Sequence, residues 1–211
     1  MVSANDLSHS ARLGATSSVS GRLWLGLGVW LATALILAAI GFLDQLPVTA
    51  IPLCIWTPVL LLALAIWRSP SLRRAVNAVP LHALVGFHSV RAVVGAAFLF
   101  YEAHGLLTPA FALPAGIGDV AVGLSSLPIA WLAARRGAEA ARRAVFAWNL
   151  CGLIDILLVF VTAQRILLFG EGPTAMRAFF LFPNPTIPLF LVPMVLLTHA
   201  LIALRTRRAH S

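Results

Sequence analysis

The sequence predicts an all-α polytopic membrane protein, a bundle of six transmembrane helices with both termini in the cytoplasm. Of its 211 residues, 60% are hydrophobic and only 10% are charged, and the mean hydropathy is +0.94. Soluble domains carry about 25% charged residues. The apolar residues gather in several runs of about 17 residues or more, which is long enough to cross the hydrocarbon of a bilayer. Short arginine clusters separate these runs, as loops next to a membrane do.

The predicted domain order is a tail, a membrane domain and a second tail. Residues 1–21 are polar and rich in Ser and Ala, which predicts a disordered cytoplasmic tail. The transmembrane domain is expected over residues 22–205, and residues 206–211 form the second cytoplasmic tail. The first apolar run is too long for a cleaved signal peptide, so we expect an uncleaved span. The six predicted spans are 23–43, 46–67, 80–104, 109–134, 144–168 and 186–204.

Local signals support the ends of these spans. Pro52 and Pro58 lie in the second span, where a proline is expected to kink a helix embedded in lipid. Gly105 is placed to end the third span with a left-handed cap. Thr108 and Pro109 are a suitable N-cap and first residue for the fourth. The sequence therefore marks where the third span ends and where the fourth begins.

The arginines predict the orientation. With six spans, the arginines expected on one side are Arg12, Arg22, Arg68, Arg73, Arg74, Arg135, Arg136, Arg142, Arg143, Arg205, Arg207 and Arg208. Only Arg165 and Arg177 fall on the other side, so both termini are predicted to be cytoplasmic and the protein to lie in the cell (inner) membrane as a multi-pass protein. Because topology accounts for the net charge of +8, we expect the lipid bilayer as partner and no nucleic acid. A homo-oligomer is left open.

A buried polar cluster is expected in the middle of the bundle. Arg91 lies near the centre of the third span, where an arginine costs about 2.5 to 3.5 kcal/mol to insert and so needs a partner. At 1.5 Å per residue, Arg91 and Asp155 both lie about 16 Å from the cytoplasmic end of their spans, and Asp119 lies about 22 Å in. We therefore expect the third, fourth and fifth helices to converge, with Arg91 contacting at least one of the two acids. The candidate site residues are Arg91, Asp119, Asp155, His88, Asn149, His199 and Glu102.

Helical periodicity places the residues of this cluster on one face of the third helix and one face of the fourth. One face of the third helix carries His88, Arg91, Gly95, Phe98 and Glu102. One face of the fourth carries Gly116, Asp119, Gly123 and Ser126. Residues three or four apart share a helix face, and small residues beside an acid allow a neighbouring helix to approach closely. Both faces are thus expected to point into the bundle.

The cluster allows several functions. It can be purely structural, because buried pairs fix helix packing without doing chemistry. However, one Arg facing two Asp leaves a carboxyl that must bind a proton, share one with a His, or pair with an imported cation. This surplus favours a proton-coupled or small-solute transporter. A membrane-embedded enzyme acting on a lipid or isoprenoid is an alternative, with Asp119 or Asp155 as acid or base.

Haem or metal binding by His88 and His199 is a further alternative. The sequence contains no soluble-enzyme or metal-binding motif, so the catalytic residues, any cofactor and the question of enzymatic activity stay open, and no metal ligands are assigned.

Three strings resemble a known group of proteins. FALPAGIGD, WNLCGLID and FPNPTIPLFLVP are similar to segments of small six-helix inner-membrane proteins of bacteria that carry no assigned activity. The resemblance covers about residues 80–204, and it implies the membrane localisation alone.

Overall fold

The chain is all-helical, as the sequence predicts. The computed structural model describes residues 4–207, with side chains for residue 21 and residues 23–207, and that part contains no strand. The long helices are α1 (Ala4–Ala39), α2 (Ile51–Arg68), α5 (Val90–Ala103), α6 (Pro109–Phe169) and α7 (Val192–Arg207). Shorter helical elements connect them: η1 (Phe42–Gln45), η2 (Val48–Ala50), α3 (Pro70–Ala78), α4 (Leu81–Phe87), η3 (Gly172–Phe180) and the π-helical η4 (Ile187–Leu191).

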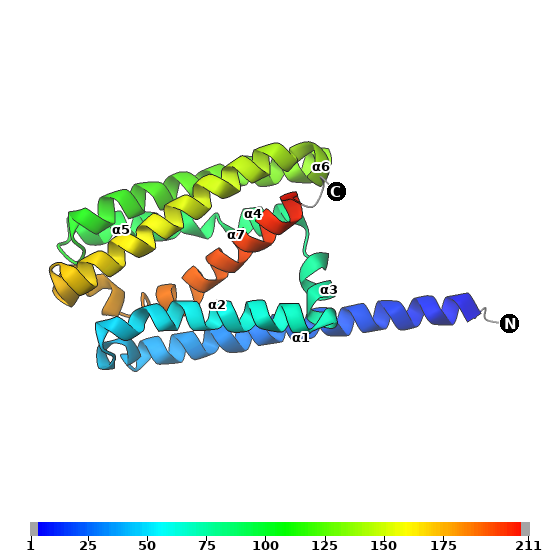
Figure 1. The fold of residues 1–211 in the computed structure, drawn as a ribbon, viewed down its shortest axis with the longest axis horizontal. Helices are drawn as coiled ribbons and strands as arrows, with labels where there is room; N and C mark the ends of the chain where they lie inside the picture. The colour runs from blue at the N-terminus through cyan, green and yellow to red at the C-terminus, as the bar shows by residue number, and fades with distance from the viewer. Residues whose placement is uncertain (1–3, 208–211) are drawn as a thin grey trace.

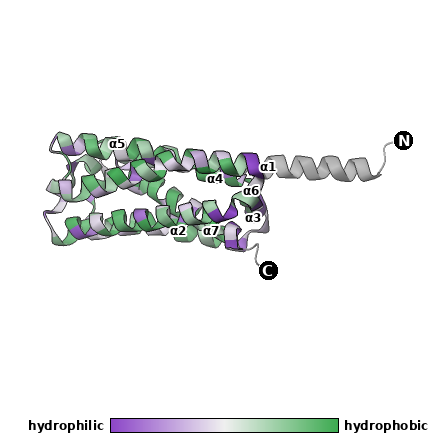
Figure 2. Ribbon diagram, turned by 90° about the horizontal axis from the view of Figure 1, so that it is seen from above, coloured by the Kyte–Doolittle hydropathy of each residue, from purple (hydrophilic) through white to green (hydrophobic). Residues whose placement is uncertain are grey.

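Four helical stretches are long and apolar enough to cross a membrane: Val48–Arg68, Leu81–Ala103, Pro109–Phe169 and Ile187–Arg207. A shorter apolar stretch covers Leu23–Ala39 within α1. Figure 2 shows apolar residues along most of the length of these helices, with hydrophilic residues gathered at the end where α3 and the C-terminus lie. The composition of the helices therefore fits insertion into a membrane.

The longest helix, α6, is folded back on itself. Gly137 breaks it with φ 82° and ψ 160°, a backbone conformation that favours glycine. The two halves then run side by side (Figure 1), and Trp148 Nε1 of the second half donates to Ser125 Oγ of the first at 3.1 Å. These halves correspond to the predicted fourth and fifth spans.

The predicted third span is also one helical stretch with a local change. Between α4 and α5 the backbone tightens at His88 and Ser89, where the amides of both residues bond to carbonyls three residues earlier. The stretch keeps its overall direction, since α4 and α5 follow one another along the same layer (Figure 1). No sequence signal predicts this turn, because neither Pro nor Gly lies at its centre.

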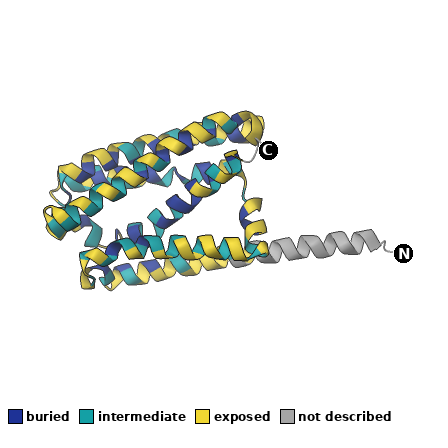
Figure 3. Cartoon of the chain, viewed as in Figure 1, coloured by how far each residue is buried: buried dark blue, intermediate teal, exposed yellow. Residues whose placement is uncertain are grey.

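Helix α7 lies between α2 and the α6 hairpin, and α5 packs along α6 (Figure 1). Figure 3 shows the buried residues on the faces that these helices turn toward one another and the exposed residues on their outer faces. The element η3 folds back against this bundle, because its Ala175 carbonyl accepts from the Thr108 amide and its Ala178 amide donates to Leu106. The core thus lies around α5, α6 and α7.

The N-terminal segment differs from the prediction. Where a disordered tail was expected over residues 1–21, helix α1 begins at Ala4 and continues without interruption into the first apolar run. A helix that is already nucleated gains one hydrogen bond for each residue it adds, which explains an extension into a polar segment. Residues 1–3 of this tail and residues 208–211 of the second lie outside the described residues, and α7 extends to Arg207.

Candidate functional site

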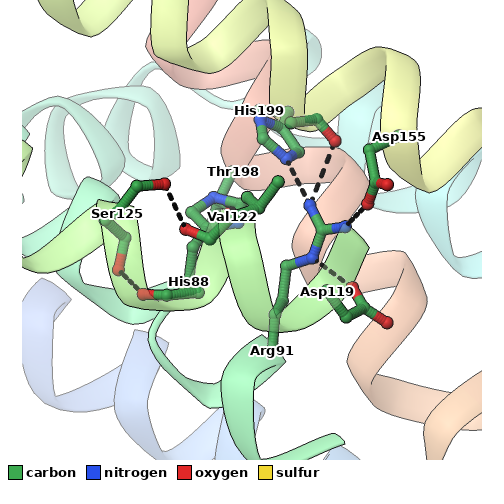
Figure 4. Close-up of polar contacts among 11 residues, drawn as sticks. His88, Arg91, Asp119, Val122, Ser125, Asp155, Thr198 and His199 are labelled. Carbon is green, nitrogen blue, oxygen red and sulfur yellow. Dashed lines mark hydrogen bonds and ion pairs between the residues drawn. The ribbon is translucent and has the colours of Figure 1, made fainter. Parts of the chain in front are cut away.

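Arg91 is the centre of the buried polar cluster. It is 2% exposed, and its guanidinium contacts three helical segments. Nε donates to Asp119 Oδ1 at 2.6 Å, and NH2 donates to Asp155 Oδ2. NH1 donates to the Gly152 carbonyl at 3.0 Å and lies 3.5 Å from His199 Nε2 (Figure 4). One positive charge therefore meets two carboxylates, and both acids expected near Arg91 are its partners.

Two close helix contacts depend on glycine. A Cβ built at Gly95 would lie 2.8 Å from Asp119 Cβ, and one at Gly152 would lie 2.7 Å from His199 Cε1. Real side-chain atoms do not approach so closely. The backbones of α5 and α6 meet at Gly95, and the His199 ring of α7 packs against α6 at Gly152, only because glycine has no side chain. The small residues that surround Asp119 in the sequence, Gly116, Gly123 and Ser126, are all buried as predicted. This close packing brings α6 within reach of Arg91.

Asn149 fixes the orientation of His199. Asn149 Nδ2 donates to the backbone carbonyl of His199 at 3.2 Å, which leaves Oδ1 as an acceptor. His199 Nδ1 lies 2.9 Å from this oxygen and therefore carries the ring proton. The lone pair on Nε2 then faces the guanidinium of Arg91. His199 is accordingly a neutral acceptor in this arrangement.

His88 is fully buried on the other side of His199. Its ring centroid lies 4.1 Å from that of His199 and 5.2 Å from Trp148. The hydroxyl of Thr198 donates to backbone carbonyls of its own helix, so at 3.2 Å it accepts from His88 Nε2. Within the described part of the chain, His88 Nδ1 has no hydrogen-bond partner. Neither histidine is hydrogen-bonded to an acid.

The histidine pair does not fit a haem or a metal ion. Two axial histidines approach a haem iron from opposite faces, whereas these rings pack against each other and leave no room for a porphyrin between them. The guanidinium beside His199 would also repel a metal cation. Among the side chains that the structure describes, those of residue 21 and residues 23–207, no group of three or more His, Cys, Asp and Glu is arranged to hold a metal.

Six of the seven predicted site residues come together: Arg91, Asp119, Asp155, His88, Asn149 and His199. Glu102 does not join them. It shares the helix face of Arg91, but it lies eleven residues further along α5, about 16 Å away at 1.5 Å per residue. It is half-buried there, and no ion pair involves it among the described residues.

An apolar pocket ends at this cluster. Arg91 and Asp119 form its polar end, and its cavity volume is about 80 Å³. Its walls come from η1, α2, α5, both halves of α6, η3, η4 and α7, and they are apolar except for Gln164. The second half of α6 contributes one face to the pocket, which consists of Ile156, Val159, Phe160, Ala163, Gln164 and Leu167. The pocket therefore extends from Arg91 toward the end of the bundle formed by η3, away from the arginine-rich loops.

The opposite side of the cluster is packed. Toward the arginine-rich end, a core of Leu84, Val85, Val145, Trp148 and Ile202 fills the space between α4, both halves of α6 and α7. The polar cluster thus has a pocket on one side and a closed core on the other.

Sequence reasoning missed some participants. Thr198, the partner of His88, is the polar residue next to His199, and that adjacency was the available signal. The Gly152 carbonyl, which accepts from Arg91, has no sequence signal because every residue carries one. The pocket walls likewise depend on how distant segments meet.

Comparison with known proteins places the chain in a family. No curated protein and no solved structure matches it. Residues 48–206 match the family described as Domain of unknown function (DUF8737). This match covers α2 to α6, α7 up to Thr206, every residue of the polar cluster and all of the pocket lining except Leu43. The chain therefore belongs to the DUF8737 family.

Proposed function

We propose that the protein is a six-span inner-membrane carrier that binds a small apolar solute in the pocket at Arg91 and couples this binding to a proton. The six spans are the apolar part of α1, α2, the α4–α5 stretch, the two halves of α6, and η4 with α7. The placement of α3, the α6 turn and the C-terminus at one end of the molecule supports cytoplasmic termini, because these segments carry the arginine clusters (Figure 1).

The observation that carries the proposal is the pocket ending at a surplus carboxylate. Apolar walls favour an apolar solute over a hydrated one, since a polar solute would lose its water without replacement. At the polar end, Arg91 is always charged and faces two acids. An excess negative charge is costly in a bilayer, so one carboxyl of the empty site holds a proton. Solute and proton therefore meet at the same residues.

The closed core on the cytoplasmic side supports a carrier. Alternating access requires a site that is open to one face while the other face is sealed. The pocket lies on the η3 side of Arg91, and the core around Val145 and Trp148 seals the opposite side. The sealed side of the site is what alternating access requires of one face of a carrier.

Proteoliposomes with a pH dye in the lumen test this proposal. A panel of small compounds that have an apolar chain and neutral, cationic or anionic heads is added outside, and the change in luminal pH is compared with that of empty liposomes. Ala163→Phe should abolish the response because it fills the pocket, whereas Ala147→Phe, at an exposed position of the same helix, should leave it unchanged. If no compound moves protons, or if Ala163→Phe responds like the wild type, the carrier proposal is wrong.

A lipid or isoprenoid enzyme is the second candidate. The same apolar walls favour it, with Asp119 as the acid or base at the end of the pocket. Incubation of the protein with a membrane lipid extract discriminates the two: an enzyme converts a lipid into a new product, whereas a carrier leaves the extract unchanged.

A further inference from the structure

We infer that the solute is a monovalent cation with an apolar chain, and that it enters the pocket in exchange for the proton of the Arg91 site. This inference rests on the proposed function and specifies its solute class. It follows from three properties of the pocket's polar end. The N–H donors of Arg91 are already engaged, one carboxylate oxygen of Asp119 is free, and one arginine faces two acids.

The donors at the polar end are already engaged. Arg91 has five N–H groups. Four of them point to Asp119, Asp155, the Gly152 carbonyl and His199. An anionic head such as a carboxylate or sulfonate would have to compete with two resident carboxylates for the same guanidinium. The site is therefore poorly suited to anions.

An acceptor, in contrast, is free. Asp119 accepts from Arg91 through Oδ1, and no hydrogen bond to its Oδ2 occurs among the described residues. Figure 4 shows this second oxygen directed away from the guanidinium. Asp119 lines the pocket, whereas Asp155 does not. A positive head at the end of an apolar chain would reach this oxygen from within the pocket.

The charges at the site require that the arriving cation replace the carboxyl proton and not simply bind beside it. Arg91 balances one carboxylate, and the second is neutralised by a proton when the pocket is empty. The titratable groups facing the site are Asp119 and Asp155 from α6, His199 from α7 and, behind it, His88. The side chains that α2, η3 and η4 contribute to the pocket are all apolar. Because neither histidine is bonded to an acid, an arriving cation replaces the carboxyl proton, which leaves to solvent, and the cluster stays neutral.

Two permanently charged probes test the exchange. Octyltrimethylammonium and octanesulfonate have the same apolar chain and opposite charges, and neither takes up or releases a proton itself. Binding to the wild type in nanodiscs is measured by calorimetry, and proton release by a pH dye in weakly buffered solution, with empty nanodiscs as the blank. We expect the cation to bind at least about ten-fold more tightly than the anion, a difference of about 1.4 kcal/mol, and to release close to one proton for each molecule bound.

Variants assign the effect to Asp119. Asp119→Asn should abolish proton release and weaken cation binding, whereas Glu102→Gln, which removes a carboxyl outside the pocket, should change neither. Equal binding of the two probes, or cation binding without proton release, would overturn the inference. If Asp119→Asn does not fold, the comparison of the two probes on the wild type decides the question alone.

The outcome for Ala163→Phe separates this inference from the proposed function. If a probe binds, and Ala163→Phe prevents its binding, the pocket is a solute site even where charge preference and proton release are absent, and only the exchange is refuted. If a probe binds and Ala163→Phe leaves its binding unchanged, the pocket is not the solute site and both proposals fail. If neither probe binds, the inferred solute class is wrong, and the proteoliposome assay decides on the carrier.

Discussion

Asn149 and His199 hold each other through two hydrogen bonds, one to the ring and one to the backbone of the histidine. These bonds join the second half of α6 to α7 and direct Nε2 of His199 toward Arg91. The amide suits this task because it accepts and donates through two different atoms, whereas an ionised acid has no donor.

Asn149→Ala should destabilise the protein. It removes two hydrogen bonds between helices, and such bonds contribute about 0.6 kcal/mol on average and up to about 1.7 kcal/mol in membrane proteins. We expect the free energy of unfolding in mixed micelles to fall by about 1 to 3 kcal/mol. Asn77→Ala, at an exposed position of α3, is the control and should have little effect. Equal stabilities of the two variants would contradict the role of Asn149.

Substitution of Arg91 should lower the folded yield more than substitution of its partner Asp155. Arg91→Met leaves the buried carboxylate of Asp119 and the partly buried carboxylate of Asp155 without a cation, and breaking a buried pair costs about 3 to 5 kcal/mol. Asp155→Asn instead leaves a balanced pair of Arg91 and Asp119, and the Asp155 side chain is 21% exposed, against 4% for Asp119. Folded yield in the membrane should therefore fall far more for Arg91→Met than for Asp155→Asn.

The combined variant Arg91→Met, Asp119→Asn, Asp155→Asn provides the control for this order. It contains no buried charge at the site, so we expect it to recover part of the yield that Arg91→Met loses. Losses that simply add across the three positions would show that the groups do not interact.

Gly95 is expected to tolerate no side chain. A Cβ there would lie 2.5 Å from the Gly116 carbonyl oxygen, so α5 and α6 would have to separate. We expect Gly95→Ala to lower stability by about 1 to 3 kcal/mol, as overpacking does. Gly28→Ala is the matched control, because nothing lies within 4 Å of its added Cβ. In a helix it should be neutral or slightly stabilising, and thermal unfolding of the two variants would show the opposite order if the contact were unimportant.

The proposed topology can be checked by labelling single cysteines. After replacement of Cys54 and Cys151 by Ser, Arg74→Cys on α3 should react only with reagents that enter the cytoplasm, and Thr174→Cys on η3 should react from outside intact cells. Both positions are exposed. Labelling of Arg74→Cys from outside would invert or rule out the six-span arrangement.

Depth counting and helical periodicity predicted the polar cluster because both depend on local geometry. A rise of 1.5 Å per residue places Arg91 and Asp155 at one level, and residues three or four apart share a face. Glu102 shows where this reasoning stops: it shares the face of Arg91 but lies too far along the helix to reach the acids. Residues must share both a helix face and a depth in the membrane to meet at one site.

The pocket could not be predicted in the same way. Its walls bring together η3, α2 and α7, whose mutual positions depend on tertiary packing between distant segments. The hydrogen bonds between Asn149 and His199 depend on how α6 and α7 meet, and the contact of the His88 ring with the His199 ring depends on how the α4–α5 stretch meets α7. The helical extension of α1 to Ala4 was missed because its polar residues carry no helical stripe.

Infrared spectroscopy of the empty protein tests the central claim most directly, because a protonated carboxylic acid has a carbonyl stretch that is separate from those of carboxylates and amides. Since one arginine faces two acids, we expect the wild type to show this band, Asp119→Asn and Asp155→Asn each to lose it, and octyltrimethylammonium to remove it on binding. Glu102→Gln should retain the band. If the wild type has no such band, or if it persists in both Asp119→Asn and Asp155→Asn, the site holds no exchangeable proton and the account of a proton-coupled pocket is wrong.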